Sequence, residues 1–69
     1  MSNEPFEIMA IIEKTTEKAA MIVDGGEFIW LPLSQIKVNG DEVESDDIKI
    51  GEVCTVEMPE WLAIKKGLI

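Results

Sequence analysis

The sequence lacks histidine, arginine and tyrosine, and it contains a single cysteine. Without histidine or a pair of cysteines, the chain has no zinc or dithiol site of a recognised kind and no internal disulfide. The lone Cys54 lies in an apolar stretch, whereas a reactive thiol needs positive charge nearby. We therefore expect a buried structural thiol, no cofactor and no metal.

Long apolar runs are also missing. No stretch approaches the roughly 18 apolar residues that a membrane-spanning helix needs. Residues 1–5 are polar and acidic, which predicts a flexible N-terminus and no signal peptide. Because an unpaired cysteine is typical of a reducing compartment, we expect a cytoplasmic protein that does not bind membranes.

Positive charge is scarce, since 6 lysines stand against 14 aspartates and glutamates and give a net charge of −8. This balance disfavours attraction to nucleic acids and anionic lipids, and it favours a basic protein partner. A chain of 69 residues forms one domain, here residues 1–69, with a thin core.

Apolar side chains recur at every second position from Phe6 to Ile12, which is the period of a β-strand. A helix over residues 6–13 is the alternative, because glutamate, methionine and alanine are good helix formers. Met9 and Ile11 make the other face apolar as well, so we expect part of this strand to be buried on both sides.

Residues 18–23 and 28–31 indicate a second and a third strand, joined by a turn at Gly25 and Gly26. Glycine readily takes the positive φ that a two-residue hairpin requires. Pro32 ends the third strand because it cannot donate to a ladder. A turn of 3₁₀ type over residues 33–36 and a short strand at residues 37–38 follow.

Residues 39–47 are the charge-dense part of the chain, and mutual repulsion predicts a solvated acidic loop there. Residues 53–58 indicate a further strand that turns Cys54, Val56 and Met58 towards the core. Pro59 and Gly67 are typical of the first turn and the end of a helix, which we place at residues 59–67.

Together these elements predict a mainly β fold. We expect a small curved antiparallel sheet or partial barrel, OB-like, with about four to five strands. One short C-terminal helix caps it.

Part of this pattern resembles the S-one type of OB-fold repeat in ribosomal proteins. The similar segments are Ala20-Met21-Ile22-Val23 with Gly25-Gly26, then Ile29-Trp30-Leu31-Pro32-Leu33-Ser34-Gln35-Ile36, then Ile50-Gly51-Glu52-Val53-Cys54-Thr55-Val56. That family binds RNA through aromatic and basic residues on exposed strands. The resemblance implies single-strand binding by Phe28, Trp30, Lys14 and Lys18, and such a binder must also gather Lys37 beside them.

A second resemblance runs over most of the chain. Residues 18–20, 30–36 and 59–69 look like parts of short uncharacterised proteins of phages and mobile elements. These proteins are often encoded beside genes of DNA replication and recombination. The resemblance implies an accessory protein of phage DNA metabolism or host takeover.

Phe28 and Trp30 are two residues apart and therefore share one face of their strand. On the outside they would form a stacking platform for bases. A small domain has few large side chains for its centre, however, so we expect at least one of them in the core. The opposite face, with Ile29 and Leu31, is equally apolar, which predicts an interface with a protein partner or a second copy.

The many carboxylates do not indicate an enzyme, because general acid–base catalysis needs a cleft that shifts their pKa values. The acidic loop could gather Ca²⁺ or Mg²⁺, but it lacks the spacing of an EF-hand, and we interpret it as a solvated charge run.

Three functional hypotheses follow, in order of preference. The first is a non-enzymatic accessory protein that binds a protein partner, with an acidic loop that imitates a nucleic-acid backbone; its contacts would be Asp41, Glu42, Glu44, Asp46 and Asp47. The second is a single-stranded nucleic-acid binder, and its contacts would be Phe28, Trp30, Lys14, Lys18 and Lys37. The third is a structural or oligomerisation subunit.

Overall fold

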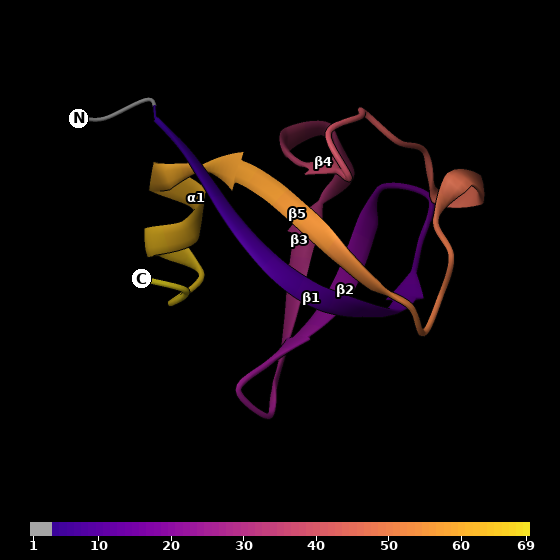
Figure 1. The fold of residues 1–69 in the computed structure, drawn as a ribbon, viewed down its shortest axis with the longest axis horizontal. Coiled ribbons are helices and arrows are strands. Elements are labelled where there is room, and N and C mark those ends of the chain that lie inside the picture. Colours follow the sequence, from indigo (N-terminus) through magenta and orange to yellow (C-terminus); the bar gives the residue numbers. More distant parts are fainter. Residues whose placement is uncertain (1–3) are drawn as a thin grey trace.

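The computed structural model describes residues 4–69 as one antiparallel sheet with a short helix beside it (Figure 1). The elements in chain order are β1 (Pro5–Thr15), β2 (Ala19–Asp24), β3 (Glu27–Pro32), η1 (Leu33–Gln35), β4 (Lys37–Val38), η2 (Ser45–Asp47), β5 (Val53–Pro59) and α1 (Glu60–Lys65). The predicted mainly β fold with five strands and a C-terminal helix is confirmed, and residues 6–13 are strand rather than helix.

The strands lie in the order β3-β2-β1-β5-β4, with β1 in the centre. The first half of β1 pairs with β5, so that Phe6 lies opposite Met58, and its second half pairs with β2. The register shifts between Ile12 and Lys14, and such a bulge bends a strand. Figure 1 shows β1 curving across the middle of the sheet. Because β3 and β4 each have one neighbour, the sheet does not close into a barrel.

The β2–β3 hairpin turns through two glycines. Gly25 has φ +57° and Gly26 has φ +84°, and Asp24 pairs with Glu27 on either side of them. Only glycine, and asparagine to a lesser degree, adopts these angles without strain. The hairpin predicted at residues 24–27 is therefore confirmed.

The acidic segment 39–47 has more local structure than the expected loop. Asn39 and Gly40 both have positive φ and form a second two-residue turn, closed by hydrogen bonds between Val38 and Asp41. The Asn39 side chain accepts a hydrogen bond from the Thr55 N–H at 3.0 Å, which ties this turn to β5. Residues 45–47 form η2.

A capping box stabilises η2. The Asp47 carboxylate accepts a hydrogen bond from the Glu44 N–H at 3.3 Å, and the Glu44 carboxylate accepts one from the Asp47 backbone. Two orphan backbone donors are satisfied in this way. The second half of the acidic segment thus has a defined turn, although all its carboxylates remain at the surface.

The hydrophobic core lies on one face of the sheet, here called the inner face. Alternate residues of the strands point into it, as the period of two requires. The fully buried side chains among them include Ile12, Ile22, Leu31, Val56 and Met58. Cys54 also faces the core, so the predicted inward face of residues 53–58 is confirmed.

Both ends of the described chain meet at one end of the sheet. The helix is shorter than the predicted 59–67: it begins at Glu60, with Pro59 as N-cap, and ends at Lys65. Leu62 and Ala63 bury one side of it against the core. Of the segment 1–5, predicted to be flexible, residues 1–3 lie outside the described residues. Pro5 already belongs to β1 and pairs with Pro59.

Candidate functional site

The second face of the sheet, here called the outer face, carries large apolar side chains in contact with solvent. It consists of the odd-numbered residues of β1 as far as Ile11, Lys14 beyond the bulge, the odd-numbered residues of β2 and β5, and the even-numbered residues of β3. Met9 is 73% exposed, Phe28 67%, Val53 60% and Trp30 41%. Apolar groups on this scale are normally covered, so the outer face is the first candidate for a binding surface.

Strand register joins these side chains into a continuous surface. Phe28 lies opposite Val23, Val23 opposite Ile11, and Ile11 opposite Val53, which gives one apolar row across four strands. Side chains directly opposite each other on one face are in contact range. The row therefore runs without interruption from β3 to β5.

A second row lies beside the first. Trp30 lies opposite Met21, and Met21 lies opposite Lys14 on β1. Met21 is only 8% exposed but does not belong to the core cluster, as expected for a residue sheltered by its neighbours on the outer face. The outer face therefore has a small apolar layer of its own.

Two predictions about these residues were wrong. Neither Phe28 nor Trp30 is in the core, because Ile29 and Leu31 occupy the inner side of β3. Met9 is also uncovered, so the N-terminal strand is not buried on both sides there, whereas Ile11 is half-buried. Met9 faces outward because the pairing of β1 with β5 fixes which residues of β1 face the core.

The three lysines of the nucleic-acid hypothesis do not gather at one place in the sheet. Lys14 lies in the row of Trp30, but Lys37 is on β4, at the opposite edge of the sheet from β3, where it pairs with Glu57. Lys18 lies in the β1–β2 connection. One lysine of the three thus shares a strand row with an exposed aromatic side chain.

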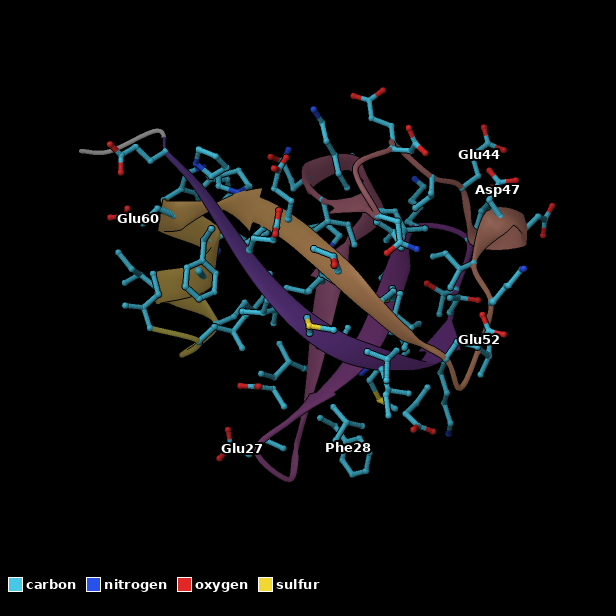
Figure 2. All side chains as sticks on the ribbon, viewed as in Figure 1. Glu27, Phe28, Glu44, Asp47, Glu52 and Glu60 are labelled. Carbon is cyan, nitrogen blue, oxygen red and sulfur yellow. The ribbon has the colours of Figure 1, made fainter. Side chains whose placement is uncertain are left out.

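Carboxylates lie on the outer face and at its edges. Glu7 and Glu57 lie opposite each other on the outer face of β1 and β5. Asp24 and Glu27 flank the hairpin turn but have the parity of the inner face, and Glu27 and Phe28 lie on opposite sides of the hairpin (Figure 2). The outer face therefore has an apolar centre with one pair of carboxylates on it, and further carboxylates lie at its edges.

The acidic loop forms part of a second candidate surface, an open cleft of about 870 Å³. We call it the acidic cleft; its lining residues are Glu17, Lys18, Leu33, Ser34, Glu42, Val43, Glu44 and Asp47. Of the five predicted contacts, Glu42, Glu44 and Asp47 line it, and Asp41 and Asp46 do not. Figure 2 shows Glu44 and Asp47 close together beside η2.

The sequence analysis missed Glu17 as a member of this acidic cleft, and it missed Met9 and Val53 as members of the outer face. Glu17 reaches the cleft because its neighbour Lys18 accepts a hydrogen bond from the Leu33 N–H at 2.8 Å. Nothing in the local sequence signals that long-range contact. For Met9 a signal was present, namely apolar residues at both parities of its strand. For Val53 there was none, because Thr55 and Glu57 on the same face of its strand are polar.

Titratable groups of residues 4–69 lie at the surface, with one exception. No charged side chain in this range is buried. The exception is Cys54, whose thiol donates to the Ala10 carbonyl at 3.5 Å and whose pKa is raised by burial. No group of three potential ligands that could hold a metal ion occurs in the described part of the chain.

Comparison with known proteins gives no match. No family model fits the chain, and neither a curated protein nor a solved structure is significantly similar to it. Within residues 4–69, no helix has the length and apolarity needed to cross a bilayer. The function must therefore be argued from the two surfaces themselves.

Proposed function

We propose that this chain is a non-enzymatic binding protein whose partner is a protein with a basic surface. The observation that carries the proposal is the uncovered apolar outer face, with Met9, Phe28 and Val53 exposed on three different strands. An apolar centre with a polar rim is the usual anatomy of a protein–protein interface. The surface position of all the charged groups described above supports a role without catalysis.

Charge selects the kind of partner. Glu7 and Glu57 lie opposite each other on the outer face, and the whole chain carries a net charge of −8. Such a field attracts basic proteins and repels acidic ones and nucleic acids. The acidic cleft supplies a further patch of the same sign, which supports the hypothesis that the loop imitates a nucleic-acid backbone.

The setting is proposed from the resemblance to accessory proteins of phages and mobile elements. In that setting the partner is a nucleic-acid-handling protein of the host or of the element, because such proteins present basic surfaces. The protein would then act by occupying that surface.

The test compares two double variants as baits in affinity capture from a lysate of the source organism. Met9→Ser/Val53→Ser removes exposed apolar groups from the outer face, and Ile64→Ser/Ile69→Ser removes equally exposed ones at the C-terminal end. We expect a specific basic partner with the wild type and with the C-terminal variant, and its loss with the outer-face variant. Equal recovery by both variants would contradict the proposal. Circular dichroism must first show that both variants fold.

A single-stranded nucleic-acid binder is the second candidate. It is favoured by the exposure of Phe28 and Trp30 on one face, with Lys14 in the row of Trp30. Base stacking would quench Trp30 fluorescence, so a Trp61→Phe background isolates the signal. A titration with an oligothymidylate at low salt that leaves the fluorescence unchanged removes this candidate.

A structural or oligomerisation subunit is the third candidate, and the apolar outer face would then bind a second copy. Sedimentation equilibrium separates it from the proposal, because a partner-binding module stays monomeric alone. We favour a heterologous partner because two copies of a chain with a net charge of −8 repel each other.

A further inference from the structure

β3 is a free edge of the sheet along its whole length. Its one sheet neighbour is β2, whereas the opposite edge, β4, has only two residues, Lys37 and Val38. An unpaired edge is a template for another strand, and proteins usually protect it with lysine, proline or a bulge. Between its terminal residues Glu27 and Pro32, β3 has none of these devices.

The hairpin geometry tells which backbone groups of β3 point outward. In a two-residue hairpin the residues that flank the turn, Asp24 and Glu27, exchange hydrogen bonds with each other. Hydrogen-bonded and non-hydrogen-bonded pairs then alternate along the ladder. The pairs Val23–Phe28 and Met21–Trp30 are therefore of the second kind. It follows that the N–H and C=O groups of Phe28 and Trp30 point away from β2.

Pro32 supports this assignment independently. It lies opposite Ala19, at the same parity as Phe28 and Trp30, so its missing N–H falls on the open edge and not in the ladder. Among residues 4–69, no backbone hydrogen bond outside the ladder uses the peptide groups of Phe28 or Trp30. Four backbone groups, two donors and two acceptors, are thus open to a further strand.

Side chains beside this edge define what an added strand should carry. Phe28 and Trp30 begin the two apolar rows of the outer face, so a strand next to β3 would extend both rows. It would do so with bulky apolar residues two positions apart. At the hairpin end the strand lies next to Glu27, which pairs with Asp24 and has the parity opposite to Phe28 and Trp30. These two carboxylates favour a lysine or arginine there, one position away from the apolar residues.

From this geometry we propose that β3 binds an extended segment of the protein partner as a sixth strand. The segment carries two bulky apolar residues at alternating positions and a basic residue beside them. Main-chain hydrogen bonds to Phe28 and Trp30 provide affinity, and the outer-face rows provide specificity, as in other cases of β-strand addition. This inference rests on the proposed function and specifies how the same face engages its partner.

The test uses a synthetic peptide of alternating valine and lysine, about seven residues long, in an NMR titration of the full chain. Binding should shift the amide signals of Phe28 and Trp30 and slow their hydrogen exchange. Two N-methylated isomers of the peptide, substituted at odd or at even positions, keep the charge and the side chains. One isomer should lose affinity about tenfold more than the other, because only one set of peptide N–H groups faces β3.

A matched pair of variants tests the protein side. Phe28→Pro removes one outward N–H without removing a ladder bond, and Phe28→Ala removes the aromatic ring but keeps the N–H. The proline variant should bind the peptide at least about tenfold more weakly than the alanine variant. The amide spectrum of each variant shows whether the sheet is intact.

Three results would overturn this proposal. One is equal affinity of the chain for both methylated isomers together with shifts of amide signals on the outer face. That result would contradict strand addition at β3 but not the proposed function. Another is the absence of binding up to about 1 mM peptide. The third is a dimer of the free chain that protects Phe28 and Trp30, which makes a second copy the occupant of the edge. Failure of the affinity capture would instead remove the proposed function itself.

Discussion

The two sides of β3 predict a sharp contrast between substitutions at neighbouring residues. Leu31 is 0% exposed and belongs to the core cluster, whereas Phe28 is 67% exposed on the outer face. Leu31→Ala leaves a cavity in a closely packed core and should cost about 3 kcal/mol of unfolding free energy. Phe28→Ala removes a ring that is about one-third buried, which scales to roughly 1 kcal/mol.

For a chain of 69 residues these costs are large. The free energy of unfolding of such a domain is about 3–10 kcal/mol. Each kcal/mol lowers the melting temperature of a small domain by about 4–8 °C. Leu31→Ala should therefore lower it by about 12–24 °C, or leave the chain unfolded at ambient temperature, while Phe28→Ala lowers it by less than about 8 °C.

Urea and thermal unfolding followed by circular dichroism measure both values. A two-state analysis is appropriate for a single domain of this size, and the urea dependence should be the same for the wild type and Phe28→Ala. If Phe28→Ala destabilises the protein as much as Leu31→Ala does, Phe28 packs in a core and the outer face is not a free surface. That result would refute the assignment of faces on which both proposals depend.

Three further predictions concern the supports of the sheet. Gly26→Val places a β-branched residue at φ +84° and should lower the unfolding free energy in urea by about 1–2 kcal/mol. Gly25→Asn, which creates an Asn-Gly turn, should lower it by less than about 0.5 kcal/mol. Asn39→Ala removes the hydrogen bond from the Thr55 N–H and replaces a residue that tolerates positive φ, so the unfolding free energy should fall by about 1–2 kcal/mol. An unchanged unfolding free energy would show that this turn does not hold β4 in place. Burial raises the pKa of Cys54 above its ordinary value of 9.0, so its stabilising contribution is complete below that value and is lost as the pH rises through the raised pKa of the folded state. Cys54→Ala should therefore lose less stability than the wild type between neutral and alkaline pH, and equal losses would contradict this assignment.

Local sequence signals were sufficient for much of the fold. The turn at Gly25 and Gly26, the end of β3 at Pro32 and the inward face of β5 each depend on a few adjacent residues whose conformational preferences agree. The short strand β4 was predicted, but the turn at Asn39 was hidden within a segment interpreted only by its charge. In such a segment the repulsion between carboxylates and the turn propensity of Asn39-Gly40 act together. The repulsion was the clearer signal in the sequence.

The candidate site was harder to predict because it depends on contacts between distant residues. Both faces of residues 28–31 are apolar, so periodicity alone could not tell whether Trp30 or Leu31 is buried. The pairing of β3 with β2 and of β2 with β1 determines that Leu31 faces the core. The acidic cleft likewise combines Glu17 with residues 42–47, and their separation in the chain hides this. Composition predicted a basic partner, but the surface proposed to bind it, the outer face, could be located only from the strand pairing.

Methionine oxidation of the complex tests the central claim most directly, because Met9 is exposed on the outer face while Met58 is buried in the core. In the free protein, dilute peroxide should oxidise Met9 before Met58, as their exposed fractions of 73% and 2% predict. Bound to the protein recovered by affinity capture, Met9 should be oxidised several-fold more slowly, with the rate for Met58 unchanged. Oxidation of Met9 at the free rate in a saturated complex would show that the partner binds elsewhere, and it would contradict the account of the outer face as the binding surface.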